Sequence, residues 1–180
     1  VEQCQADVNV KNENKQTPLH IATEKFNIDV VKYFVEECQV DVDIKDIYEQ
    51  TPLHIAIKYS KFDIIRYLVE QCQADVNVKN KNRETPLHIA AEKCNADIVR
   101  YLVEQCQADV DIKDIYGQTP LHIAIKYSSF DSVKCLIEQG NADVNIKNLN
   151  EQTPLHIATE KCNADIVKCL VEQGNADIKT

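Results

Sequence analysis

The chain has 180 residues, of which 44% are hydrophobic and 27% charged, and its formal net charge is −9 at pH 7. The hydrophobic content is enough for a packed core. The acidic balance argues against binding nucleic acid through its phosphates, which needs clustered lysine and arginine, and no apolar run approaches the roughly 20 residues of a membrane helix. We therefore expect no nucleic-acid binding and no membrane insertion, and a basic peptide or protein surface is the more natural partner.

The predicted elements begin with residues 1–11, which have the sequence of the end of a helical unit. Because the chain contains no Met and starts inside this unit, we interpret it as a piece of a longer array. A short helix is predicted over about residues 18–25, since Thr17 is a good N-cap and Pro18 suits the first helical position. A second helix is predicted over residues 29–36, where apolar side chains recur on one stripe at helical spacing.

An alternating stretch at residues 41–45 and a turn follow the second helix, and then the pattern starts again. The motif Thr-Pro-Leu-His-Ile-Ala occurs five times at a spacing of 34 residues, beginning at Thr17, Thr51, Thr85, Thr119 and Thr153. Neither helix is long enough to be stable alone in water. Each unit must therefore bury its apolar stripe against its neighbours.

This motif closely resembles the signature of ankyrin repeats. The resemblance extends through Asp-Ile-Val-Arg-Tyr-Leu-Val-Glu at 97–104 and Ala-Asp-Val-Asn at 74–77, and it covers essentially the whole chain. It implies an all-α solenoid of stacked helix–turn–helix units with extended finger loops. It predicts one array over residues 1–180, in which a tail of a preceding repeat at 1–11 is followed by repeats at approximately 12–45, 46–79, 80–113, 114–147 and 148–180.

Some glycine and aliphatic positions depart from the family pattern. The usual glycine of the finger survives only as Gly117, and a positive φ would be mildly strained at the residues that replace it, which are Lys15, Glu49, Arg83 and Glu151. Gly140 and Gly174 are expected to be left-handed helix terminators. Ser132 stands where the other repeats have Val or Ile, and this should weaken the fourth repeat by about 1–3 kcal/mol.

The eight cysteines recur at a few fixed repeat positions, without the Cys-x-x-Cys spacing of zinc or dithiol sites. Equivalent positions in stacked repeats lie about 8–10 Å apart, beyond the roughly 7 Å Cα separation that a disulfide allows. We therefore expect small buried thiols in a reducing compartment, which indicates a cytoplasmic protein.

Each repeat also carries one histidine in its motif. Neighbouring copies lie too far apart to share a metal ion, because His–metal bonds are only about 2 Å long. The resemblance implies a structural role instead, in a hydrogen-bond network with the motif threonine and the backbone of adjacent loops. The predicted structural residues are Thr17, His20, Thr51, His54, Thr85, His88, Thr119, His122, Thr153 and His156. No catalytic or phosphate-binding motif occurs, so we expect no catalytic residue, metal, cofactor or enzymatic activity.

The second and fourth repeats share two further segments, Ile-Lys-Asp-Ile-Tyr at 44–48 and 112–116 and Ile-Ala-Ile-Lys-Tyr-Ser at 55–60 and 123–128. This pattern indicates that a 68-residue unit was duplicated. Ankyrin repeats grip partners on their concave face, with the finger tips and the exposed end of the first helix. The resemblance therefore implies a partner-binding set of Ile47, Tyr48, Lys58, Tyr59, Ile115, Tyr116, Lys126 and Tyr127.

Exposed tyrosines are good anchors, because each brings a large apolar body with a polar tip. Duplication without function would also explain the copies, and a tyrosine at a helix end can simply pack on its neighbour. The Glu-Lys pairs of the odd repeats, such as Glu24-Lys25, are interpreted as solvated surface.

The sequence thus predicts a protein-interaction module that binds a protein or peptide. The alternative is a structural spacer or scaffold segment of a longer ankyrin-repeat protein, with no discrete partner of its own. Neither end carries the polar capping repeat that closes most solenoids, so end-to-end stacking of the terminal repeats on further repeats or on another molecule is also predicted.

Overall fold

The computed structural model describes residues 7–177, which divide into two compact units with the boundary after Asp75. Every regular element in this range is a helix. In both units, short helices come in pairs joined by tight turns, and a long loop leads from each pair to the next. This arrangement confirms the predicted all-α repeat fold.

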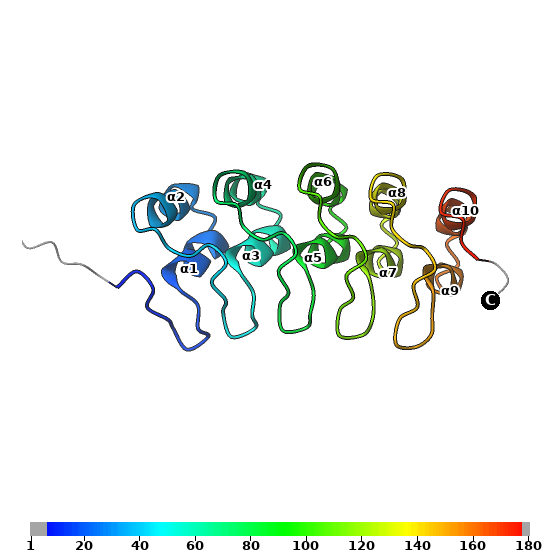
Figure 1. Ribbon diagram of the computed structural model, residues 1–180, viewed down its shortest axis with the longest axis horizontal. Coiled ribbons are helices and arrows are strands. Elements are labelled where there is room, and N and C mark those ends of the chain that lie inside the picture. Colours follow the sequence, from blue (N-terminus) through cyan, green and yellow to red (C-terminus); the bar gives the residue numbers. More distant parts are fainter. Residues whose placement is uncertain (1–6, 178–180) are drawn as a thin grey trace, which may run out of the picture. The chain divides into compact units, whose positions relative to one another are not determined.

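Unit 1, the part before the boundary, contains two helix pairs. α1 lies beside α3 and α2 lies beside α4, so the first helices form one layer and the second helices another (Figure 1). The apolar stripe is fully buried at Leu19 and Val31 in the first pair and at Leu53 and Ile65 in the second. The elements are α1 (Pro18–Glu24), α2 (Ile28–Glu36), α3 (Pro52–Lys58), α4 (Phe62–Arg66) and the π-helical turn η1 (Tyr67–Gln71).

Unit 2, the part after the boundary, contains three helix pairs of the same kind. α5, α7 and α9 form one layer, and α6, α8 and α10 form the other (Figure 1). The elements are α5 (Pro86–Glu92), α6 (Ala96–Arg100), the π-helical turn η2 (Tyr101–Gln105), α7 (Pro120–Lys126), α8 (Phe130–Glu138), α9 (Pro154–Glu160) and α10 (Ala164–Glu172).

Each first helix begins where the motif predicted it. Thr17 is extended, with φ −88° and ψ 167°, and Pro18 opens α1 at a position where a missing N–H leaves no hydrogen bond unmade. The backbone N–H of Thr17 donates to Nδ1 of His20 at 3.1 Å. The motif histidine therefore closes the start of the helix, in addition to any role between loops.

The loops keep the turn of an ankyrin finger although most of them lack its glycine. Lys15, Glu49, Arg83 and Glu151 have φ values of 55°, 57°, 59° and 61°, close to the 72° of Gly117. The left-handed conformation costs a non-glycine residue free energy. The hydrogen bonds within and between the fingers, described below, must therefore offset this cost.

The prediction for Gly140 and Gly174 is wrong. The positive φ falls one residue later, at Asn141 (52°) and Asn175 (53°). A Cβ at Gly140 would lie 2.9 Å from Cγ1 of Val110, and a Cβ at Gly174 would lie 2.7 Å from Cγ1 of Val144. These glycines therefore allow a close approach of the preceding loop, while the asparagine tolerates the left-handed turn.

Ser132 is fully buried on α8, and the hydroxyl of Ser129 donates to its Oγ at 2.8 Å. The equivalent Ile64 and Ile166 are also buried, with 2% and 0% of their surface exposed. The serine thus occupies an aliphatic core position and satisfies its hydroxyl locally, whereas the isoleucines bury more apolar surface.

Candidate functional site

The tip of each finger is held by one side chain at its base. In unit 1, Oδ1 of Asp46 accepts the backbone N–H groups of Tyr48 at 2.8 Å and Gln50 at 2.9 Å. In unit 2, Oδ1 of Asp114 accepts the N–H groups of Tyr116 and Gln118, both at 2.8 Å. Both aspartates are buried, so each positions a tyrosine on a fixed backbone.

Sequence reasoning missed these positioning residues. A signal was present, because an Asn or Asp stands at the base of every finger, at Asn12, Asp46, Asn80, Asp114 and Asn148. The short polar side chain of either residue type accepts backbone N–H groups two residues along the chain. This repeated residue was assigned no role from the sequence, because its role depends on how the finger closes on itself.

Adjacent fingers of the same unit are also joined through their backbones. The N–H of Ile47 donates to the carbonyl oxygen of Asn14 at 2.9 Å. The N–H of Ile115 likewise donates to the carbonyl of Asn82 at 2.9 Å, and that of Leu149 to the carbonyl of Tyr116 at 3.0 Å. These bonds tie the three finger tips to the ones before them and leave the side chains of Ile47, Ile115 and Leu149 to project.

Three of the predicted residues of unit 1, Tyr48, Lys58 and Tyr59, line one depression, here called the first groove. It has a volume of about 560 Å³. The finger contributes Tyr48, and the end of α3 contributes Lys58 and Tyr59. The remaining lining residues are Asn14, Gln16, Glu24, Asp46, Gln50 and Ile55.

Unit 2 contains the equivalent depression, here called the second groove, at positions 68 residues further along the chain. Its volume is about 90 Å³. Tyr116, Lys126 and Tyr127 line it. The other lining residues are Glu84, His88, Glu92, Asp114, Gln118 and Ile123.

The tyrosines of both grooves are exposed to a similar degree. Tyr48 and Tyr116 have 60% and 63% of their surface exposed, and Tyr59 and Tyr127 have 40% and 46%. Ile47 and Ile115 are each 40% exposed at the finger tips but do not line the grooves. The structure therefore separates the eight predicted residues into two groove-lining triplets and two finger-tip isoleucines.

The two grooves differ in what supports the tyrosine of the first helix. In both, the lysine before it lies over its ring, with Nζ 5.6 Å from the centroid of Tyr59 and 5.8 Å from that of Tyr127. In unit 1, Phe26 adds an edge contact to Tyr59 at 5.4 Å between centroids, and Nζ of Lys61 lies 3.8 Å over Phe26.

Unit 2 has Cys94 and Ser129 at the positions of Phe26 and Lys61. There, Sγ of Cys94 donates weakly to the carbonyl of Tyr127 at 3.8 Å. The first groove is therefore bordered by an aromatic and cationic cluster, whereas the second is bordered by small polar groups.

Three of the histidines join neighbouring loops. Nε2 of His20 lies 3.1 Å from the carbonyl oxygen of Gln50. The equivalent distances are 3.1 Å between His88 and Gln118 and 3.3 Å between His122 and Gln152. A carbonyl only accepts, so Nε2 carries the proton and Nδ1 accepts from the motif threonine. This is the neutral ring, and burial lowers the pKa of all three histidines.

The other two histidines differ from each other. His54 is fully buried, and its Nδ1 accepts the Thr51 N–H at 3.1 Å. His156 accepts from Thr153 in the same way but is exposed. Burial of a motif histidine therefore varies along the chain, while its bond to the motif threonine does not.

The prediction that the thiols are buried is only partly right. No disulfide joins cysteines of the described range, and Cys135 and Cys169 are buried. Burial raises the pKa of Cys135 to about 11. Cys94 and Cys162, however, lie exposed at the turn between paired helices, where the backbone leaves the core after the first helix.

No cluster of three His, Cys, Asp or Glu side chains in residues 7–177 could hold a metal ion. None of the helices described there has the length and apolar character to cross a membrane.

Comparison with known proteins agrees with this geometry. A family model described as ankyrin repeats (3 copies) matches residues 1–80, 72–148 and 133–180. Together, these matches span the whole chain. No curated protein matches it.

Proposed function

The chain belongs to the ankyrin-repeat family, and from this premise we propose that it binds a protein or peptide through the first and second grooves. Ankyrin repeats are generally protein–protein interaction modules and are typically not enzymes. The proposal assigns the binding residues, which the family alone does not specify.

The observation that carries the proposal is the repetition of an exposed tyrosine pair around a hollow. Tyr48 with Tyr59, and Tyr116 with Tyr127, stand at the same two positions of their units, one on a finger and one at a helix end. Exposed aromatic rings beside a depression are typical anchors, because a partner side chain that enters the depression buries them at little entropic cost.

The charges suggest the chemistry of the partner. Glu24 in the first groove and Glu92 in the second are both acidic, and the chain as a whole carries a net charge of −9. Opposite charge accelerates association and favours the correct register. We therefore propose a partner segment that combines a lysine or arginine with an apolar or aromatic side chain, and binding that weakens as salt is added.

Affinity capture with the full chain tests the proposal. Capture from a lysate would compare the wild type with a Tyr48→Ala/Tyr116→Ala variant and a Tyr59→Ala/Tyr127→Ala variant. Truncation of two anchors is expected to reduce recovery of a partner at least about tenfold, since one anchor contributes 1–2 kcal/mol or more. Mass spectrometry would identify the proteins that are lost.

Tyr33→Ala is the matched control, because Tyr33 is 59% exposed on α2 and lines neither groove. It should leave recovery unchanged. Equal recovery by the wild type and both double variants would show that the tyrosines are not anchors.

A structural spacer is a second candidate, and the packing of Tyr59 favours it. The edge contact with Phe26 and the lysine over its ring give this tyrosine neighbours within its own unit. A spacer has no discrete partner, so the wild type and the tyrosine variants would capture the same proteins in the same amounts. Its stability would instead rise steeply as repeats are added.

A further inference from the structure

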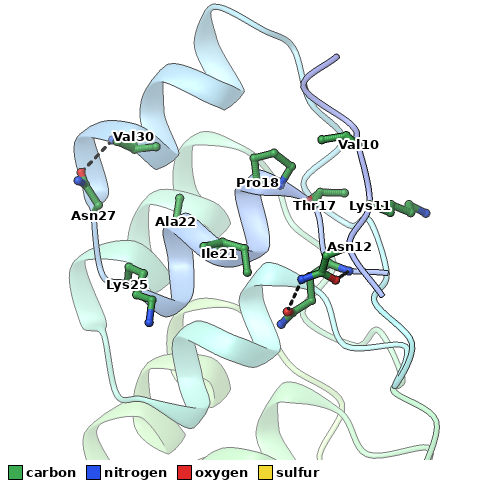
Figure 2. A pocket seen from close by; sticks show the side chains of 11 residues that line it. Val10, Lys11, Asn12, Thr17, Pro18, Ile21, Ala22, Lys25, Asn27 and Val30 are labelled. Atoms are coloured by element: carbon green, nitrogen blue, oxygen red, sulfur yellow. Dashed lines mark hydrogen bonds between the residues drawn. The ribbon is translucent and has the colours of Figure 1, made fainter. Parts of the chain in front are cut away.

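An open apolar pocket lies on the face of α1 and α2 in unit 1. Figure 2 shows Val10, Ile21 and Val30 directed into it, with Pro18 and Ala22 between them. Its volume is about 590 Å³. Val10 is 57% exposed and Val30 37% exposed, so the pocket presents apolar surface to solvent.

The same surface is covered in unit 2. On the last helix pair, α9 with α10, Ile166 stands at the position of Val30 and is fully buried. Ile157, at the position of Ile21, is also buried, whereas Ile21 is half-buried. The pair α7 and α8 packs against α9 and α10. The pocket is therefore the surface that a preceding helix pair covers.

The helix pairs are of two types, which differ at one covered position near the end of the first helix. We call a pair Ile-type where this residue is isoleucine, at Ile57 and Ile125, and small-type where it is Thr23, Ala91 or Thr159. Ile125 is fully buried and Thr159 is exposed. No helix pair follows α9 and α10 in the described range, and Thr159 is left exposed there. The side chain at this repeat position is therefore covered by the following helix pair.

In unit 2, the small-type pair α9 and α10 thus packs against a preceding Ile-type pair, α7 and α8. The pair α1 and α2 is also small-type, because Thr23 stands at the covered position. The loop before it carries a second signature: Asn9 matches Asn77 and Asn145, which follow Ile-type pairs, whereas Asp43 and Asp111 follow small-type pairs.

We propose that the pocket on α1 and α2 is a docking surface for a helix pair of the Ile-type. Its isoleucine, at the position of Ile125, fills the space beside Ala22 and Val30. A small-type pair would bring only Ala or Thr there and bury less apolar surface against the pocket. The surface is distinct from the two grooves, so this proposal and the proposed function can fail independently.

Two extensions of the full chain test the proposal. Residues 69–80 have the same sequence as residues 1–12, so a copy of residues 46–68 placed before Val1 completes an Ile-type pair. Residues 103–109 likewise match residues 1–7, so a copy of residues 80–102 completes a small-type pair of equal length. The two extended chains are equal in length and differ only within the added segment.

Amide hydrogen exchange of α1 and α2 is the readout. The Ile-type extension is expected to slow exchange there by at least about tenfold more than the small-type extension, because it buries more apolar surface. Val30→Ser should abolish most of this difference in the extended chain, while changing the unextended chain little, since Val30 is partly exposed in it.

Equal protection by the two extensions, or greater protection by the small-type one, would overturn the proposal. Sedimentation of the unextended chain tests whether a second copy of the chain occupies the pocket instead. If it formed oligomers that Val30→Ser dissociates, the pocket would bind a second copy through its small-type end, and the assigned specificity would be wrong.

Discussion

The first and second grooves are built from equivalent residues yet differ in size and surroundings. Both contain a tyrosine on a finger, a lysine and tyrosine at a helix end, and an aspartate at the finger base. Their volumes are about 560 Å³ and 90 Å³. The duplicated segments thus keep the potential anchors, and the residues around them have changed.

The difference lies mostly in side chains outside the shared segments. Gln16 in the first groove is replaced by Glu84 in the second, and Phe26 beside the first groove is replaced by Cys94. Two copies of one site can therefore present different shapes while their backbones are held by the same hydrogen bonds. Under the proposed function, we therefore expect the two grooves to differ in affinity.

The largest expected effect tests what the grooves share. Asp46→Ala and Asp114→Ala each leave two backbone N–H groups at a buried finger base without an acceptor, so we expect a loss of about 2–3 kcal/mol in the free energy of unfolding. Urea denaturation measures this loss. Asp46→Asn and Asp114→Asn keep the acceptor and are the controls, because Asn occupies this position in the other fingers. A loss as large in the Asn variants would assign the effect to charge instead.

The next effect concerns the helices that lie behind the grooves. Ser132→Ile places in α8 the residue that α4 has at Ile64, and it should raise the free energy of unfolding by about 1–2 kcal/mol through added apolar burial. Ser132→Ala, measured in the same denaturation series, separates the lost hydroxyl contact from added burial. Destabilisation by isoleucine would mean that unit 2 packs too tightly at this position to accept it.

The aromatic cluster sharpens the contrast between the grooves. Phe26→Cys introduces the residue of unit 2 and removes the ring contact with Tyr59, so unfolding should become easier by about 0.5–1 kcal/mol. The equivalent Cys94 has a φ of 53°, close to the 60° of Phe26, so the exchange leaves the left-handed backbone unchanged. Phe130→Cys is a control of similar exposure. If Phe26→Cys left stability unchanged or raised it, the ring contact would contribute nothing to the stability of unit 1.

The smallest effect should be equal in the two units. Asp43 accepts the N–H of Asp75, and Asp111 accepts that of Asp143. Burial, with added repulsion from nearby carboxylates, raises the pKa of Asp43 and Asp111. Asp43→Asn and Asp111→Asn keep the acceptor without the charge, so each should stabilise by about 0.5 kcal/mol at neutral pH.

The pH dependence of this gain has a definite sign. A carboxyl with a raised pKa in the folded state destabilises the fold while it is ionised, and this penalty disappears as the pH falls towards the ordinary value of 3.8. The advantage of the Asn variants should therefore be largest at pH 7 and vanish near pH 4. Thermal melting at several pH values checks this, and a gain that grows in acid would contradict it.

Much of the fold and part of the site could be predicted from the sequence. The motif at Thr17 and Pro18 fixes where a helix starts, because capping and the missing proline N–H act within one turn. The triplet of Tyr48, Lys58 and Tyr59 was found through its exact recurrence 68 residues later. The role of Asp46 was missed because it depends on how the finger closes on itself.

The sequence by itself determined the elements of this protein, because helix starts, apolar stripes and a 34-residue period are local properties that repeat. Only the tertiary structure decided which side chains are exposed or meet. Cys94 is exposed, whereas Cys135 is buried, and Gly140 makes room for Val110 while Asn141 makes the turn. The physical reason is that exposure and close approach depend on which neighbouring loop or helix packs against a residue, and that neighbour lies about one repeat away in the chain.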